Sequence, residues 1–130
     1  LLPGATFFLG LSKHAPARHI IQAGGATALC TDYNPGSSHM QSMPFVLTLA
    51  CSQMHLSVDE SLWAATQGGA RAMGMQGLVG GLEPGYSADF TLWPFTQAEQ
   101  LPYACGDCKP DAVFIRGQLE AGSAQQVLTS

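Results

Sequence analysis

Charged residues are scarce in this chain of 130 residues, and their scarcity limits what it can bind. Only 11% of the residues are charged, whereas about 25% is typical of soluble domains. The five Lys and Arg residues are scattered singly, and the net charge is −4 at pH 7. Without a basic stripe, the chain is not expected to bind nucleic acid or an anionic membrane. So few charges instead suit a segment whose surface is covered by the rest of a larger protein.

Long hydrophobic runs are lacking as well. The chain is 46% hydrophobic, but no run approaches the ~20 apolar residues of a membrane-spanning helix. The apolar stretch at residues 1–11 contains Pro3 and Gly4 and lacks a charged leader, so it is not typical of a signal peptide. We therefore expect no membrane partner.

Cysteine is too sparse for a disulfide framework, with four residues in the chain. Cys30 and Cys51 are interpreted as small core residues, which favours a reducing compartment and a cytoplasmic location. Cys105 and Cys108 form a single C-x-x-C motif, and no second pair completes a four-ligand zinc site. We interpret this pair as incidental loop cysteines, with a metal or redox role as the alternative.

The length falls short of a complete α/β barrel. A chain of 130 residues suffices for one domain, whereas a (β/α)₈ barrel typically needs about 250 residues. No methionine begins the chain, and residues 1–2 have the pattern of a strand already under way. We expect a fragment whose partner is the missing N-terminal part of the same protein.

What the sequence does contain is an alternation of helix and strand patterns. Residues 16–23 carry apolar side chains at helical spacing between a proline and two glycines, and an apolar run follows at residues 26–31. With residues 1–2 as the end of a preceding strand, this pattern predicts a βαβ unit with parallel strands buried on both faces. Further helices are predicted at residues 43–54, 57–65 (with a capping box and with Leu62 and Ala65 facing inward) and 70–73.

From residue 78 the hydrophobic period changes to two. Residues 79–83 and 88–93 flank Pro84-Gly85 and predict one hairpin, and residues 111–116 and 118–121 flank Gly117 and predict another. The chain therefore divides into an α/β portion at residues 1–77 and a strand-rich segment at residues 78–121, with a frayed tail expected at residues 122–130.

The apolar run ends abruptly at Asp32, and Asn34-Pro35-Gly36 then forces a turn. Asp32 would lie at the carboxyl end of a parallel strand, the end that carries the active site in α/β barrels. A carboxylate there can bind a metal ion and accept a proton from water whose pKa the metal has lowered. Asp32 is thus the leading candidate for catalysis and metal binding. The alternative is an ordinary turn residue.

Three segments resemble the imidazolonepropionase family of metal-dependent hydrolases, within the amidohydrolase superfamily. They are residues 1–10 (LLPGATFFLG), 31–37 (TDYNPGS) and 81–89 (GLEPGYSAD). The first two motifs are fairly specific to the family, and the third is shared across the superfamily. The resemblance extends over most of residues 1–121. It implies the C-terminal part of a (β/α)₈ barrel followed by the C-terminal strands of a small β-sandwich.

The same resemblance implies a reaction and a cofactor. The family hydrolyses 4-imidazolone-5-propanoate to N-formimidoyl-L-glutamate in histidine degradation, using one Zn²⁺ or Fe³⁺ ion. It implies that Asp32 binds the metal and accepts the proton of water, and that Asn34, Gly36 and Ser37 contact the small-molecule substrate. The family's metal-binding histidines lie on earlier strands, so this chain alone would supply one ligand and be inactive.

Two alternatives stay open at this point. Another deaminase or cyclic amidohydrolase of the superfamily would also use Asp32, although residues 34–37 argue against it because this loop shapes the pocket. The other alternative is a non-catalytic fragment that binds a partner through an unpaired barrel seam. A homodimer or another self-associated form is expected in either case.

Overall fold

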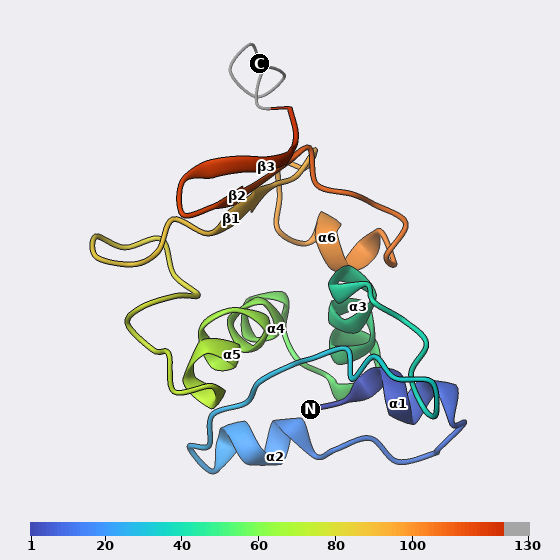
Figure 1. Cartoon of the computed structure of the whole chain (residues 1–130). Helices are drawn as coiled ribbons and strands as arrows, with labels where there is room; N and C mark the ends of the chain where they lie inside the picture. Colours follow the sequence, from blue (N-terminus) through green and yellow to red (C-terminus); the bar gives the residue numbers. More distant parts are fainter. Residues whose placement is uncertain (124–130) are drawn as a thin grey trace.

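The computed structural model describes residues 1–123 of the chain. Helices α1 to α5 gather in one part of the molecule, and the three strands form a sheet at the other end (Figure 1). Of the tail predicted at residues 122–130, the part from residue 124 lies outside the described residues. The elements in chain order are α1 (Pro3–Phe8), α2 (Ala17–Gln22), α3 (Met43–Met54), α4 (Val58–Ala65), α5 (Gln67–Ala72), β1 (Phe90–Leu92), α6 (Gln100–Tyr103), β2 (Ala112–Ile115) and β3 (Gln118–Gly122).

The backbone around Leu1 confirms a parallel neighbour for the run that ends at Asp32. The Leu1 amino group donates to the Ala28 carbonyl at 2.7 Å, and the Cys30 N–H donates to the Leu1 carbonyl at 3.3 Å. In a parallel pair, the N–H and the C=O of one residue bond to two residues of the neighbouring segment that are two positions apart. The predicted βαβ unit is nevertheless not formed, because residues 1–123 contain no strand before β1.

Two expectations about this run are wrong. Residues 26–31 do not form a regular strand, because in the described chain only Leu1 pairs with them in this way. The run is also not buried on both faces: Thr27 and Leu29 are buried, whereas Ala26 and Cys30 are exposed. Cys30 is therefore not a core residue, because its side chain lies on the open face.

Helix α1 was not expected, since Pro3-Gly4 was predicted only to end a strand. Proline is tolerated in the first turn of a helix, where its missing N–H would have no partner anyway. Pro3 occupies that position here, and both Pro3 and Gly4 are buried. The same two residues therefore end the extended segment and begin a helix.

Helices α3 and α4 confirm their predictions and form the centre of the core. The inward face of α3 carries Val46, Leu47, Ala50 and Met54, which cluster with residues from α2, α4 and the 26–31 run. Helix α4 begins with the predicted capping box, in which the Ser57 hydroxyl accepts from the Glu60 N–H and the Glu60 carboxylate accepts from the Ser57 N–H. The predicted inward residues Leu62 and Ala65 are half-buried and pack against the core, and Ser61 and Ala64 are fully buried.

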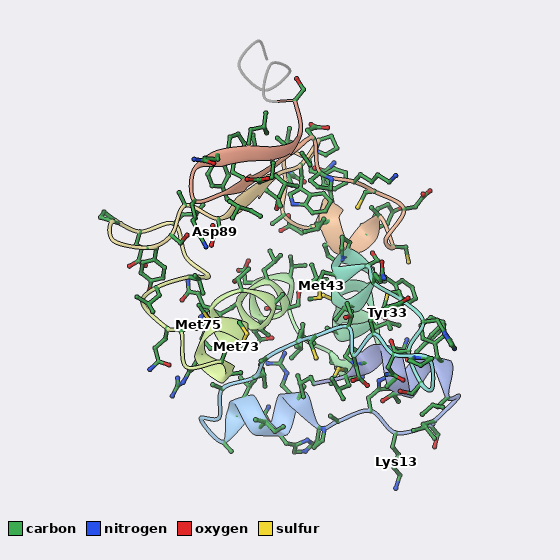
Figure 2. The ribbon with its side chains drawn as sticks, in the orientation of Figure 1. Lys13, Tyr33, Met43, Met73, Met75 and Asp89 are labelled. Atoms are coloured by element: carbon green, nitrogen blue, oxygen red, sulfur yellow. The ribbon has the colours of Figure 1, made fainter. Side chains whose placement is uncertain are left out.

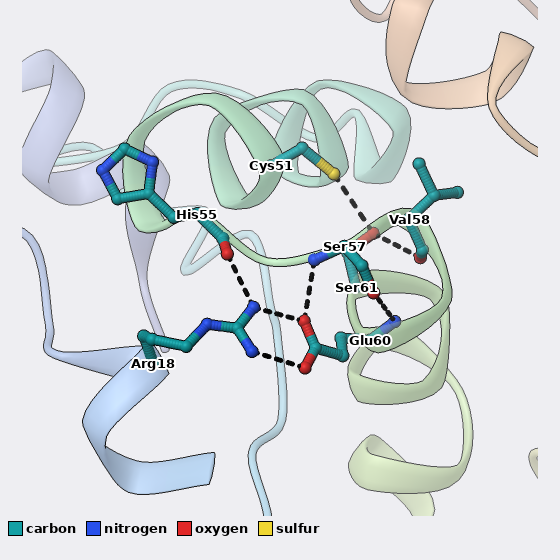
Figure 3. A network of polar contacts seen from close by, with 7 residues as sticks. All are labelled: Arg18, Cys51, His55, Ser57, Val58, Glu60 and Ser61. Atoms are coloured by element: carbon teal, nitrogen blue, oxygen red, sulfur yellow. Dashed lines mark hydrogen bonds and ion pairs between the residues drawn. The ribbon is translucent and has the colours of Figure 1, made fainter. Parts of the chain in front are cut away.

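An ion pair fastens α2 to this capping box (Figure 3). The Arg18 guanidinium donates to both Glu60 oxygens, at 2.7 and 2.5 Å, and to the His55 carbonyl at 2.7 Å. Two parallel N–H···O bonds fix the guanidinium in the plane of the carboxylate. Arg18 therefore joins α2 to both the end of α3 and the start of α4.

The sheet is antiparallel in the order β1-β2-β3. The hairpin predicted at Gly117 is confirmed by the β2–β3 pairing. The one predicted at Pro84-Gly85 is wrong, because β1 pairs with β2 instead. Residues 79–83 contain Gly80 at φ +85°, and glycine weakens a strand interior.

The segment between β1 and β2 contains the short helix α6, which the sequence did not indicate. Thr48 of α3 donates a hydrogen bond of 2.5 Å to the Pro102 carbonyl of α6. In Figure 1, α6 lies between α3 and the sheet.

Within residues 1–123, no helix combines the length and apolar content needed to cross a membrane.

Candidate functional site

Asp32 follows the last residue of the 26–31 run and adopts an unusual backbone conformation. Its φ is +49°, in the left-handed region that only a few per cent of non-glycine residues adopt. Its side chain is half-buried. Tyr33, labelled in Figure 2, separates it from the turn that begins at Asn34. Asp32 therefore lies at a sharp change of chain direction, directly after the segment paired with Leu1.

The amide side chain of Asn34 holds this loop together. Its oxygen accepts from the N–H groups of Gly36 and Ser37, both at 2.8 Å. Its nitrogen donates to the Asp32 carbonyl at 2.5 Å and to the Ser37 hydroxyl at 3.0 Å. An Asn side chain that bonds the backbone two residues on is a frequent turn stabiliser. One side chain thus bonds all three of the other predicted site residues.

The structure places the four predicted site residues in one turn, yet most of their polar groups bond to one another. The Gly36 and Ser37 N–H groups and the Asn34 amide have partners within the loop. The Ser37 hydroxyl has the longest of these contacts, 3.3 Å from the Asn34 oxygen. By contrast, within residues 1–123 no hydrogen bond or ion pair is made by the Asp32 carboxylate.

Ser38 also belongs to this loop, and no pattern in the sequence indicates a role for it. It is fully buried, at 0% exposure, and its hydroxyl donates to the Thr31 carbonyl at 2.8 Å. Its own carbonyl accepts from the Asn34 N–H at 2.9 Å. A Cβ atom on Gly4 would lie 3.1 Å from the Ser38 hydroxyl oxygen. The loop is therefore closed at its base by Ser38 and packed against the first turn of α1.

The described residues do not fit a complete metal centre. Among residues 1–123, no three His, Cys, Asp or Glu side chains lie close enough together to hold a metal ion. A catalytic zinc site usually has three protein ligands. Asp32 alone cannot meet that requirement, so further ligands would have to come from outside this chain.

The strongest electrostatic perturbation lies away from the loop. Hydrogen bonds from Arg18 and then from the Ser57 N–H lower the pKa of Glu60 to about 2, and the same pairing raises the pKa of Arg18. Burial and then the charge of Asp107 raise the pKa of Cys108. A raised pKa reduces the thiolate fraction of Cys108 and so lowers its reactivity as a nucleophile.

Two clefts of about 480 Å³ each lie elsewhere in the chain. One lies against the sheet and is lined by Phe90, Val113 and Phe114 among others. The other lies between α2, α4 and α5, where Ile21 and Trp63 form part of its wall. Neither includes residues 31–38. Neither of these two clefts therefore belongs to the Asp32 loop.

Known sequences match most of the length of this chain. The profile of the Amidohydrolase family matches residues 11–119. An imidazolonepropionase from Rubrobacter xylanophilus is 44% identical over 119 residues, and one from Solibacter usitatus is 40% identical over 118 residues. These matches cover 92% and 91% of this chain. The chain spans only 28% of the length of each of these curated relatives.

Two solved structures share the fold. An adenosine deaminase from Xanthomonas campestris with bound zinc superposes with a TM-score of 0.82 at 27% identity, over 93% of this chain and 31% of that one. The guanine deaminase of E. coli superposes with a TM-score of 0.74 at 22% identity, over 95% and 33% of the two chains. The family match, which extends over most of the sequence, shows that the chain belongs to the amidohydrolase family.

Proposed function

We propose that this chain forms the C-terminal part of an imidazolonepropionase, with the active site completed by the rest of the protein. The reaction is the hydrolysis of 4-imidazolone-5-propanoate to N-formimidoyl-L-glutamate in histidine degradation. The sequence support is the similarity to curated imidazolonepropionases at 38–44% identity. The observation that carries the proposal is the state of Asp32: its carboxylate lacks a partner in residues 1–123, while its neighbours in the loop are bonded.

Asp32 acts as the general base in this proposal. A carboxylate that accepts the proton of the attacking water leaves a hydroxide to add to the ring carbonyl. The cyclic amide bond then opens as the protonated carboxyl returns that proton to the leaving ring nitrogen. The cofactor of the complete protein is one Zn²⁺ or Fe³⁺ ion, with Asp32 as the ligand that this chain contributes. The support for a metal is the bound zinc of the adenosine deaminase that shares the fold.

Asn34, Gly36 and Ser37 form the surface of the loop that contacts the substrate. The Ser37 hydroxyl is the group most easily redirected, because its contact with the Asn34 oxygen is 3.3 Å long. The Asn34 amide and the Gly36 N–H are bonded inside the loop. Their contribution is mainly to shape the surface beside Asp32.

The substitution Asp32→Asn in the complete protein tests this proposal. Asparagine preserves the size of the side chain but cannot accept the proton, and loss of a general base typically lowers the rate by about 10²–10⁴-fold. Opening of the imidazolone ring, followed by ultraviolet absorbance, measures the effect. Asp107→Asn is the matched control, because Asp107 is exposed in the segment after α6. Full activity of Asp32→Asn would remove Asp32 from the mechanism.

Deamination is the second candidate, because both solved structures that share the fold are deaminases. Their chemistry also adds water to a ring carbon, with ammonia as the leaving group. The two proposals differ in product. If the complete protein releases ammonia from adenine- or guanine-type substrates and leaves 4-imidazolone-5-propanoate intact, the deaminase assignment is correct.

The exposed apolar side chains of this chain support a covering partner. Leu82 is 78% exposed and Tyr103 is 89% exposed, and exposed apolar patches commonly mark interaction surfaces. We infer that the rest of the same protein, together with a second copy in a homodimer, covers these residues in a cytoplasmic enzyme. Light scattering on the complete protein tests the dimer, and a monodisperse monomer would contradict it.

A further inference from the structure

The orientation of Asp32 is fixed from both sides by hydrogen bonds to the two peptide groups that flank it. The peptide before Asp32 includes the Thr31 carbonyl, which accepts from the Ser38 hydroxyl at 2.8 Å. The peptide after it includes the Asp32 carbonyl, which accepts from the Asn34 side chain at 2.5 Å. Peptide groups are planar, so two bonds that restrain these planes also restrain the φ and ψ angles of Asp32.

The two contacts are joined and shielded. The Asn34 N–H donates to the Ser38 carbonyl at 2.9 Å, so the two residues bridge the base of the loop. Ser38 is 0% exposed. A Cβ atom on Gly4 would lie 3.1 Å from its hydroxyl and 3.6 Å from the Thr31 carbonyl oxygen. Helix α1 therefore lies close against the Ser38–Thr31 hydrogen bond.

We infer that Ser38 is the positioning residue for Asp32: its buried hydroxyl holds the Thr31 peptide and keeps Asp32 in its left-handed conformation. Asp32 has φ +49°, which is unfavourable for a residue with a Cβ atom and persists only where the surroundings impose it. Without the Ser38 bond, the peptide before Asp32 can rotate and the carboxylate changes direction. The inference rests on the proposed function for one point only, the catalytic role of the Asp32 carboxylate.

A matched pair of serines separates this role from ordinary core packing. Ser61 is also 0% exposed, and its hydroxyl also donates to a backbone carbonyl, that of Val58, at 2.8 Å. It lies in α4, outside the Asp32 loop. Ser38→Ala and Ser61→Ala therefore remove the same kind of bond from equally buried sites, and only the first touches the peptide of Asp32.

The first measurement is the backbone conformation of Asp32 in the isotopically labelled chain. A positive φ gives a strong nuclear Overhauser effect between the amide and Hα protons of one residue. We expect this signal at Asp32 to persist in Ser61→Ala and to weaken in Ser38→Ala, with faster hydrogen exchange at residues 36 and 37. Ser38→Cys retains the side-chain volume and a weak hydrogen-bond donor, so we expect an Asp32 signal of intermediate strength in this variant. It also provides the test if Ser38→Ala does not fold. An unchanged Asp32 signal in Ser38→Ala or Ser38→Cys overturns the inference.

The second measurement is hydrolysis by the complete protein. Loss of a group that orients a functional ligand typically lowers activity by about 10–100-fold, so we expect Ser38→Ala to lower kcat by that factor, Ser38→Cys to restore part of it, and Ser61→Ala to leave it unchanged. If the Asp32 signal responds as expected but the wild-type protein shows no hydrolysis, the proposed function fails and the positioning role stands. If Ser38→Ala retains full activity and the Asp32 signal, the positioning role fails alone.

Discussion

At the scale of single residues, Gly68 leaves no room for a side chain. An added Cβ atom there would lie 2.2 Å from the Thr27 carbonyl oxygen and 3.0 Å from the Trp63 ring. The carbonyl belongs to the run that leads to Asp32, so a shift at Gly68 is transmitted to that run. The absence of a side chain at this position lets α5 approach the run closely.

Gly68→Ala is expected to lower the free energy of unfolding by about 1–3 kcal/mol or more, the usual cost of overpacking a core. Gly69→Ala is the matched control in the same helix, because its Cβ would lie 4.0 Å from its nearest neighbour, the Ala64 carbonyl oxygen. Alanine in a helix gains about 0.5–1 kcal/mol over glycine, so this variant should be slightly more stable. Urea denaturation measures both, and equal stability of the two variants would contradict the close approach.

Glu60 makes stability depend on pH. Its pKa in the folded chain is lowered from 4.5 to about 2 by Arg18 and the Ser57 N–H. A carboxyl group with a lowered folded pKa stabilises the protein above its unfolded pKa and loses that contribution as the pH falls through the folded one. The contribution is therefore complete at neutral pH and declines between pH 4.5 and about 2.

We expect Glu60→Gln to lower the free energy of unfolding by about 1 kcal/mol at pH 7. The loss is this small because the side chains of Arg18 and Glu60 are 36% and 29% exposed, and solvent screens such pairs. The difference from wild type should shrink toward pH 2 as Glu60 itself becomes protonated. Glu83→Gln, at an exposed position, is the control. A difference that grows on acidification would contradict the assigned cause. Circular dichroism during urea denaturation at several pH values makes the comparison.

At the scale of elements, α3 organises the helical part of the chain. Its buried side chains contact α2, α4 and the 26–31 run, and its N-cap residue Ser42 directly follows the segment that leaves the Asp32 loop. The Ser42 hydroxyl accepts from the Phe45 N–H. A change in the core face of α3 should therefore weaken the support of the loop as well as the core.

Leu47→Ala in α3 is expected to lower the free energy of unfolding by about 2–5 kcal/mol, because it leaves a cavity at a residue that is 3% exposed. Gln53→Ala, on the exposed face of the same helix, should change stability by less than about 0.5 kcal/mol. Thermal denaturation of the two variants gives the comparison. A small loss for Leu47→Ala would mean that the face of α3 is not the core.

Local sequence signals indicate some elements of this chain but not those that depend on contacts far apart in the sequence. Helices α2, α3 and α4 were predicted because their spacing, capping box and flanking glycines are local signals. Helix α1 was missed because Pro3-Gly4 ends an extended segment as readily as it begins a helix. The pairing of β1 with β2 was missed because partner choice in a sheet depends on contacts far apart in the sequence.

At the scale of the whole molecule, this chain is much shorter than its relatives, and its described residues lack a cluster of metal ligands. It spans 28% of the length of the imidazolonepropionases that it resembles, and the described residues contain no group of three metal ligands. A single carboxylate cannot hold a catalytic ion against water. The proposed activity would therefore need metal ligands beyond those of the described residues.

The 130-residue chain on its own is expected not to bind Zn²⁺ at one equivalent with micromolar affinity and not to hydrolyse 4-imidazolone-5-propanoate. Competition with a coloured chelator measures the affinity. The double variant Cys105→Ser, Cys108→Ser removes the C-x-x-C thiols, so any weak binding by them can be subtracted. Tight binding that survives this variant and disappears in Asp32→Asn would show that the chain alone forms a metal site.

The sequence by itself determined the family, the helices with local start and stop signals, and the place of Asp32 after an apolar run. These follow from short-range chemistry: spacing, capping, turn residues and motifs. Only the tertiary structure decided that Leu1 pairs with residues 28–30 and that Ser38 is buried beneath α1. These last features depend on contacts between segments that fold against one another, and a buried serine has the same letter as an exposed one.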